Sequence, residues 1–350
     1  MKKTITLATA VAALTAPAMA ANIPGPYSTV HNMENPLYLP EQNMFYSKLS
    51  NGIMLKVADN SWAHREKNHS GGFEFPIVRV QEEMGYGITD RWAAHFMLQY
   101  THDNDIGRTG LSGGRLGTTY RILNLYNGFV WDVYGDIHLG GVGEMRGTYN
   151  VKGNLPTGKV YGVFDYDNYS DGMWGFHAGT KFGHVWDKFT AQAFVEILHT
   201  FADDNNMIRV VGANKVNRLT LANLDAPTQI SAKIKGYTDV SAGVQGFYEF
   251  SNRWSMGGWF KFNRHSDKGI DKITSDIPNL QSLKVALEKQ LADMEDGWDE
   301  YVIGASFSNQ LTNNTQVTVY GEYTFDDSHR KSQNGTDVKA EMGVRLNFTF

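Results

Sequence analysis

The 350-residue sequence contains no cysteine. Thiol catalysis, thiolate metal sites and disulfide bonds are therefore excluded, and the fold has to be stabilised in other ways. Basic residues are also in short supply, because 32 Lys and Arg stand against 37 Asp and Glu. This acidic balance argues against a nucleic-acid partner, which requires a basic face.

Long hydrophobic runs are missing as well. No window of the sequence approaches the roughly 20 apolar residues of a membrane-spanning helix. Yet aromatic residues make up 13% of the chain, and 36 residues are glycine. Many short strands, each with one apolar face, would account for these three observations together.

The first residues have the pattern of a secretory signal peptide. Lys2 and Lys3 form a short basic region, and the apolar stretch 5–14 that follows is too short to span a bilayer. Ala18-Met19-Ala20 then provides a cleavage signature of small residues. We therefore predict a signal peptide over 1–20 and an exported chain that starts at Ala21.

The last segment alternates strictly between apolar and polar residues. Every even position from 340 to 350 is apolar, whereas Lys339, Glu341 and Arg345 lie between them. A period of two with charges on one face predicts a strand that separates two very different surroundings. The same pattern recurs along the chain and gives about twelve strands of roughly ten to fifteen residues, long enough to cross a bilayer at a tilt. The expected strands are 44–58, 72–88, 91–103, 113–125, 127–143, 172–186, 189–202, 237–250, 253–265, 300–309, 315–326 and 337–350.

Short turns alternate with long polar connections between these strands. The long connections are 59–71, 104–112, 144–171, 203–236, 266–299 and 327–336. Outer-membrane barrels have short periplasmic turns and long extracellular loops. The sequence therefore predicts an all-β fold, an antiparallel transmembrane up-and-down β-barrel over 44–350, located in the cell outer membrane of a Gram-negative bacterium. Trp92, Trp186 and Trp254 each lie beside a short turn and predict an aromatic girdle at that rim.

Two regions lack the alternation. Residues 21–43 contain four prolines, and we expect either a periplasmic N-terminal lead-in, which we favour, or a segment tucked into the lumen. Residues 278–294 carry leucines and a methionine at helical spacing, which predicts one short helix in an extracellular loop. That helix could pack on the barrel rim, cover the pore as a lid or bind an external partner.

The carboxyl-terminal run Val344-Arg345-Leu346-Asn347-Phe348-Thr349-Phe350 resembles the signal by which outer-membrane barrels are recognised by their assembly machinery. The runs Tyr86-Gly87-Ile88-Thr89-Asp90-Arg91-Trp92 and Gly117-Thr118-Thr119-Tyr120-Arg121 resemble outer-membrane transporters of the MetA-pathway phenol-degradation group. The first resemblance implies outer-membrane lipids and the assembly machinery as partners. The second covers about a tenth of the chain and implies no particular substrate.

The alternation also predicts which charged residues line the lumen. They carry both signs of charge: Lys48, Arg79, Arg115, Arg121, Asp132, Asp136, Lys181, Glu196, Glu249, Lys261, Glu322, Lys339, Glu341 and Arg345. Hairpin geometry around the turn near 125–126 would place Arg115 opposite Asp136. Two interpretations remain open, an ion-pair network that supports the barrel and a polar channel with weak charge selectivity.

Glu82 interrupts the apolar outward face of its strand. We expect a β-bulge at this position in preference to a functional carboxylate that faces lipid.

The function favoured by these patterns is a porin-like pore or transporter that passes small polar solutes passively, with no cofactor and no catalytic or metal site. The first alternative is a structural or adhesion barrel whose extracellular loops and helix 278–294 bind a partner. The second is a hydrolase at the rim, where an Asp–His pair could activate water as a general base. The candidate residues are His102, Asp103 and Asp105 at one strand end and Asp326, Asp327 and His329 at another. The run 203–206 could bind a hard cation through its oxygens, although a solvated loop tip is the simpler interpretation.

Overall fold

The computed structural model describes residues 32–57, 77–103, 108–124, 128–139, 147–155, 158–167, 174–201, 203–212, 228–266, 270–275, 297–326 and 337–350. Within these ranges no helix has the length and apolar character needed to span a lipid bilayer. The predicted signal peptide 1–20 and the predicted helix 278–294 lie outside the described residues.

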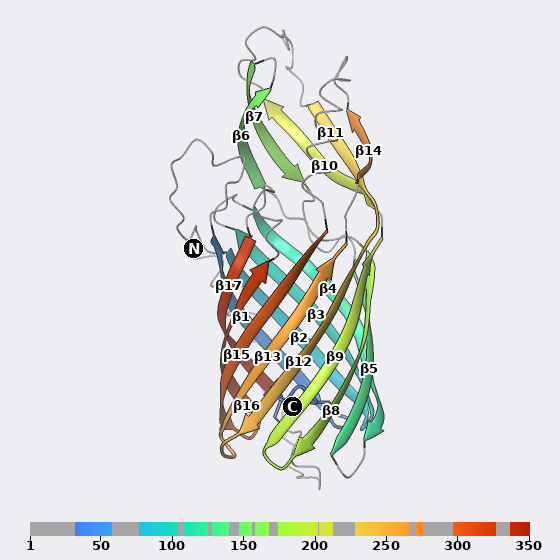
Figure 1. Ribbon diagram of the computed structural model, residues 1–350, viewed down its shortest axis with the longest axis vertical. Coiled ribbons are helices and arrows are strands. Elements are labelled where there is room, and N and C mark those ends of the chain that lie inside the picture. The colour runs from blue at the N-terminus through green and yellow to red at the C-terminus, as the bar shows by residue number, and fades with distance from the viewer. Residues whose placement is uncertain are drawn as a thin grey trace.

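Twelve antiparallel strands form one closed barrel (Figure 1). They are β1 (Phe45–Val57), β2 (Ile77–Thr89), β3 (Trp92–Asp103), β4 (Arg108–Asn124), β5 (Phe129–His138), β8 (Gly175–Trp186), β9 (Phe189–Thr200), β12 (Tyr237–Glu249), β13 (Trp254–His265), β15 (Trp298–Thr312), β16 (Thr315–Asp326) and β17 (Asp337–Thr349). The barrel closes where β1 pairs with β17. The predicted all-β up-and-down barrel is confirmed, and its strands fall on the twelve predicted segments.

The alternating pattern decides which side of each strand faces outward. Large apolar side chains remain exposed on the outer face of the barrel: Phe45, Trp131, Phe182, Val195, Val244, Phe260, Ile303, Val319, Phe325 and Met342. Water would make such a surface costly, whereas a lipid bilayer is its natural solvent. The side chains between them in each strand point the other way, and several ionised ones are buried.

The connections β2–β3, β4–β5, β8–β9, β12–β13 and β15–β16 are all short and lie at one end of the barrel, which we call the short-turn end. Trp92, Trp186 and Trp254 lie there with exposed rings, as expected for an aromatic girdle. The indole of Trp131 donates to the Thr180 hydroxyl on the adjacent strand at 2.7 Å. Polar edges of the outward aromatic side chains are therefore satisfied within the barrel wall itself.

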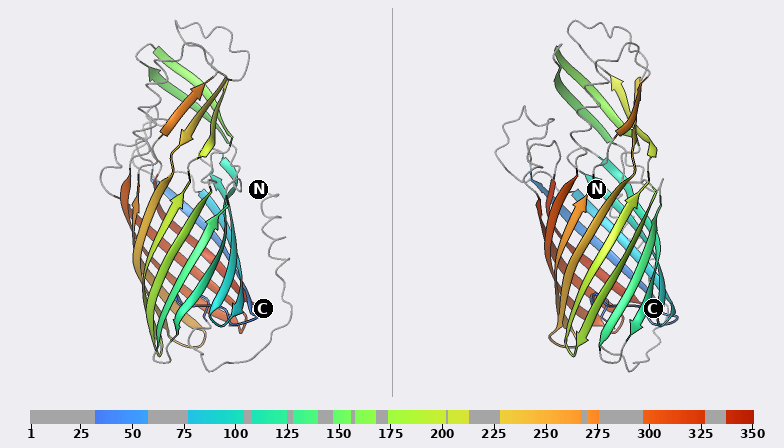
Figure 2. Two further views of the ribbon diagram at one scale, coloured as in Figure 1. Left: turned by 90° about the vertical axis from the view of Figure 1, so that its right-hand side faces the viewer. Right: turned by 45° about the vertical axis from the view of Figure 1, so that its right-hand side comes forward.

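A second sheet of five strands continues beyond the opposite, long-loop end (Figures 1 and 2). Its strands are β6 (Gly147–Leu155), β7 (Gly158–Asp167), β10 (Asp203–Gly212), β11 (Thr228–Ile234) and β14 (Ile270–Ser275). They pair in the order β14-β11-β10-β7-β6. The long connections predicted at 144–171, 203–236 and 266–299 therefore contain strands that were not predicted. The run 203–206 opens strand β10 instead of forming a loop tip.

The origin of this sheet explains why the sequence did not reveal it. Its strands come from the connections β5–β8, β9–β12 and β13–β15, which leave the barrel side by side because those barrel strands are neighbours. Unpaired backbone groups of adjacent long loops then pair with one another. These strands have at most ten residues, whereas every barrel strand except β5 has at least twelve, so their own alternation is a weaker signal.

The expected bulge at Glu82 is also wrong. Strand β2 pairs with β1 without a register shift from Phe45↔Tyr86 to Met54↔Ile77. On its other side β2 pairs continuously with β3 through Glu82↔Leu98, and the register shifts only between Gly87 and Thr89. Glu82 therefore keeps the outward orientation that its position in the alternation dictates.

Candidate functional site

Residues 32–44, which we call the N-terminal segment, lie inside the ring at the short-turn end. Their side chains and carbonyls contact inward-facing residues of strands from all around the barrel: Arg121 of β4, Lys181 of β8, Thr190 of β9, Ser255 of β13, Gln316 of β16 and Asn347 of β17. A segment outside the ring would touch neighbouring strands only. Two interpretations of 21–43 were open, a periplasmic lead-in and a segment tucked into the lumen. The contacts place 32–43 within the barrel, and residues 21–31 lie outside the described part.

Two asparagines give this segment its compact local structure. The side-chain oxygen of Asn32 accepts from the Glu34 amide at 3.1 Å, and that of Asn35 accepts from the Leu37 amide at 2.9 Å. Asn side chains favour such turns because they replace a backbone acceptor. Two successive turns keep the segment compact where it crosses the barrel end, and its Leu37 is fully buried.

The segment joins β1 through a close approach to Gly87 of β2. The amide of Asn43, which has a left-handed φ of 66°, donates to the Gly87 carbonyl at 2.8 Å. The Gly87 amide in turn donates to the Met44 carbonyl at 2.9 Å. A Cβ atom at position 87 would overlap the Glu41 carbonyl, so only glycine allows the segment to enter at this point.

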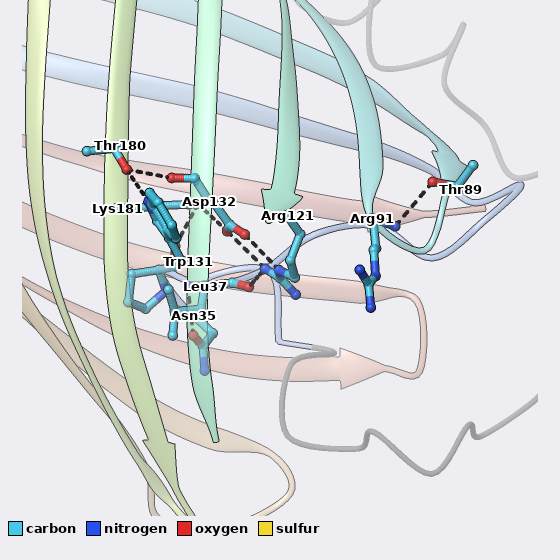
Figure 3. A network of polar contacts seen from close by, with 10 residues as sticks. Asn35, Leu37, Thr89, Arg91, Arg121, Trp131, Asp132, Thr180 and Lys181 are labelled. Atoms are coloured by element: carbon cyan, nitrogen blue, oxygen red, sulfur yellow. Dashed lines mark hydrogen bonds and ion pairs between the residues drawn. The ribbon is translucent and has the colours of Figure 1, made fainter. Parts of the chain in front are cut away.

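A buried cluster of charges holds the middle of the segment (Figure 3). Asp132 of β5 is 0% exposed and accepts from the Arg121 guanidinium at 2.8 and 3.0 Å. Lys181 lies 3.7 Å from the same carboxylate. Both cations also donate to the segment, Arg121 to the Leu37 carbonyl at 2.6 Å and Lys181 to the Pro36 carbonyl at 3.0 Å. One carboxylate thus aims two cations at the backbone of the N-terminal segment.

Glu34 anchors the start of the segment on the opposite wall. Its carboxylate accepts two hydrogen bonds from Arg345 of β17, at 2.7 and 3.0 Å, and one from Asn347 at 2.6 Å. Burial alone would raise the pKa of the Glu34 carboxyl, but Arg345, Asn347 and the nearby Lys48 together hold it below its usual range. The anchor is therefore ionised under neutral conditions.

Acidification is expected to weaken this anchor. Because the pKa of Glu34 is lower in the folded protein than the usual 4.5, its contribution to stability is complete above that value. The contribution is lost as the pH falls through the lowered pKa. Conductance traces of the folded protein at pH 7, 5 and 3 should show new open events only at the lowest pH. Glu34→Gln should show these events already at pH 7, and equal traces for both proteins at every pH would contradict the assignment.

A second polar network lies on the same inward face above the segment. Asp136 binds His95 and also His177, whose Nδ1 lies 2.7 Å from the carboxylate. The other His177 nitrogen faces Glu196 at 3.2 Å, and Glu196 is also 3.2 Å from the Lys261 ammonium. The Tyr134 hydroxyl donates to Glu196 at 2.9 Å. An imidazole protonated on both nitrogens satisfies both carboxylates in this arrangement.

The expected pair of Arg115 and Asp136 is wrong. The register places Arg115 opposite His138 and pairs Arg121 with Asp132. The connection between β4 and β5 is centred farther along the chain than predicted, and a register shift lies between Arg121 and Leu123. A displacement of two residues keeps each side chain on its face but changes its partner.

The other residues predicted to line the lumen share the inward face with these networks. Arg79 of β2 binds Glu341 of β17, whose carboxylate also accepts from the Tyr320 hydroxyl at 2.8 Å. Lys48 lies 5.7 Å from the centre of the Tyr38 ring. Glu322 is the register partner of Glu341, and Glu249 is that of Ser255. Lys339 lies in β17, but its side chain is outside the described part.

Several residues of the site were missed in the sequence. His95 and His177 occupy inward positions in the alternation, so the phase of their strands is a signal that could have found them. Asn32, Glu34 and Asn35 carry no comparable signal, because the N-terminal segment has no periodicity. The strand side chains that these three residues bind are more than 150 residues away in the sequence.

The residues of the hydrolase hypothesis are described only in part, because 104–107 and 327–336 lie outside the described ranges. Asp103 ends β3 and Asp326 ends β16, and β17, β1 and β2 separate these two strands in the ring. Within the described ranges no group of three or more His, Asp or Glu side chains is arranged to hold a metal ion. The chemistry that the inner face offers is ion pairing and hydrogen bonding around a partly exposed interior.

Comparisons with known proteins bear on the fold. No protein-family model matches the chain, and no curated protein matches its sequence. Among solved structures, the COG4313 outer membrane channel from Pseudomonas putida F1 is similar with a TM-score of 0.52 at 13% identity, covering 94% of this chain and 100% of that one. The translocator domain of the autotransporter NalP from Neisseria meningitidis has a TM-score of 0.48 at 8% identity, covering 88% of each chain. The Pseudomonas putida toluene transporter TodX has a TM-score of 0.45 at 9% identity, covering 94% of this chain and 93% of that one. The chain therefore has the fold of outer-membrane β-barrel proteins, whereas its resemblance to the MetA-pathway group stays a prediction.

Proposed function

We propose that this protein is an outer-membrane channel for small polar solutes, with an interior of mixed charge and with the N-terminal segment across its short-turn end. The observation that carries the proposal is the inner face itself, where ionised side chains of both signs are arranged in pairs. A barrel that only needed filling could use apolar side chains at lower cost, because buried ion pairs contribute little net stability.

The accessibility of the paired groups supports passage of polar solutes. The Arg79 and Lys261 side chains remain 27% and 33% exposed although both face inward. Water therefore reaches the interior beside these ion pairs. Rings of charged side chains of this kind determine which ions and solutes enter a pore.

Ion selectivity in planar bilayers tests the proposal. The wild-type protein should show discrete channel events and a reversal potential close to zero in a salt gradient. Lys261→Glu replaces an inward cation by an anion, so the reversal potential should shift toward cation preference. Lys188→Glu makes the same charge change in an exposed short turn and should leave the reversal potential unchanged. Absence of channel events from correctly folded protein would contradict the proposal.

The five-stranded sheet favours one second candidate, a barrel that also binds an external partner. The sheet extends the wall beyond the long-loop end, and among the described strands its outer members β6 and β14 each pair on one side only. Open strand edges can bind a partner through backbone hydrogen bonds. This candidate keeps the adhesion hypothesis, but it rests on the sheet in place of the helix 278–294. Deleting residues 147–167 should abolish such binding to whole cells and leave conductance events in place.

A further inference from the structure

A carboxylate lies in the middle of the lipid-facing surface. Glu82 is an outward residue of β2, and its register partners are Leu49 of β1 and Leu98 of β3. Its outward neighbours along β2 are apolar, and one of them, Met84, is exposed. An ionisable side chain among acyl chains is costly, and the cost is largest near the bilayer midplane. Packing of the barrel gives no reason for a carboxylate here.

The hydrogen bonds at this position leave a donor and an acceptor free on one surface. The hydroxyl of Ser47, which is 2% exposed, donates to one oxygen of Glu82 at 3.3 Å. Among the contacts of the described residues, the second oxygen of Glu82 has no partner. The amide of Asn51, exposed on the same face of β1, has none there either. Asn51 pairs with Val80, so it is a diagonal neighbour of Glu82 across the β1–β2 pair.

Three polar side chains elsewhere on the described outer face, Thr180, Thr118 and Asp299, have partners within the barrel. Thr180 accepts from the Trp131 indole and donates to the Asp132 carbonyl at 3.0 Å. Thr118 is bonded in the same way to Trp92 and to the Ala93 carbonyl. Asp299, near the long-loop end, lies 3.7 Å from Arg264. The patch formed by Ser47, Asn51 and Glu82 is thus the exception among these residues.

We propose that this patch is the contact between two copies of the chain in the membrane. In a symmetric pair of barrels inserted in the same orientation, the two-fold axis lies along the membrane normal, which preserves the depth of every residue. A surface on which an acceptor and a donor lie side by side is then complementary to the same surface of a second copy. The Asn51 amide of each copy donates to the Glu82 carboxylate of the other.

Lipid is a poorer occupant than a second copy. The polar groups of lipids lie at the membrane surface, whereas Glu82 and Asn51 lie near the middle of their strands. Exposed apolar side chains such as Ile53 and Met84 surround the patch and would pack in the contact. Polar residues at such positions hold membrane-embedded segments together. The contact does not depend on whether the interior conducts.

Single cysteines test the contact directly, because the chain contains none of its own. Asn51→Cys should form a covalent dimer in outer membranes on mild oxidation or with a short bismaleimide. Val244→Cys is the matched control, since Val244 is an outward residue of β12, on the far side of the ring. Dimer formation by the first variant alone supports the proposal. Equal cross-linking of the two variants, or capture of a different protein by Asn51→Cys, would overturn it.

Substitutions of Glu82 give a second, independent measurement. Glu82→Leu should raise the dissociation constant of the dimer in mild detergent at least about tenfold, whereas Glu82→Gln, which keeps an acceptor, should change it less than about threefold. Urea unfolding distinguishes a role of Glu82 in the dimer contact from a role in the stability of the single barrel. Glu82→Leu should make the single barrel more resistant to urea, because it removes a carboxylate from the lipid face. A less resistant barrel with an unchanged dimer would overturn the proposal.

Discussion

Removal of residues 32–42 is expected to raise single-channel conductance roughly threefold or more. The contacts of this segment reach β4, β8, β9, β13, β16 and β17, so the segment crosses the barrel end, and we expect it to restrict passage there. Asn43 and Met44 are kept because their backbone pairs with Gly87 and sets the start of β1. Planar bilayers give the conductance, and gel mobility before and after heating shows whether the barrel is intact.

Glu34→Gln serves as the partial control for this deletion. It removes one anchor on β17 and leaves the Arg121 and Lys181 contacts in place, so brief openings are expected in place of a permanently higher conductance. An intact deletion variant with the conductance of the wild type would show that the segment does not limit passage. The ion pairs above it would then be the narrowest part.

The second large effect is expected at Asp132. Asp132→Asn keeps the shape of the side chain but leaves Arg121 and Lys181 without the carboxylate that compensates both of them. Removing one partner from a buried ion pair costs about 3–5 kcal/mol, because the remaining charge stays buried. The free energy of unfolding should fall by about this amount in urea titrations with lipid vesicles.

Glu322→Gln is the matched control for Asp132→Asn. Glu322 is an inward carboxylate of β16 that takes no part in the ion pairs described above, so its loss should change the free energy of unfolding by less than about 1 kcal/mol. Comparable losses in the two variants would indicate a general effect of interior charge. The double variant Asp132→Asn/Lys181→Met should recover part of the loss, since it removes one of the two unpaired cations.

The barrel was predictable from sequence because its strands separate lipid from a polar interior. That contrast imposes a period of two on every strand, from Phe45 to Phe350, and the period also assigns the inward faces. The exact partners were not predictable in the same way. The pairing of Arg121 with Asp132 depends on a turn that the alternation does not specify, and a displacement of two residues leaves the hydrophobic pattern unchanged.

The alternation of apolar and polar residues did not predict two other features, the position of the N-terminal segment and the orientation of Glu82. The N-terminal segment is held by hydrogen bonds to residues such as Ser255 and Gln316, far away in the sequence, and local pattern contains no record of such contacts. Glu82 was assigned to a bulge because a carboxylate conflicts with a lipid-facing position. The register of β1 and β2 is uninterrupted there, so the carboxylate does occupy a lipid-facing position.

The pairing of β1 with β17 has a consequence for biogenesis. It joins residues about 300 positions apart, such as Ser47 and Phe348, so a ring cannot form while residues 337–349 are still being synthesised. Arg345 and Asn347 are also the residues that hold Glu34, so the N-terminal segment cannot gain this anchor before β17 is in place. Sealing of the wall and completion of the anchor therefore depend on the same last strand.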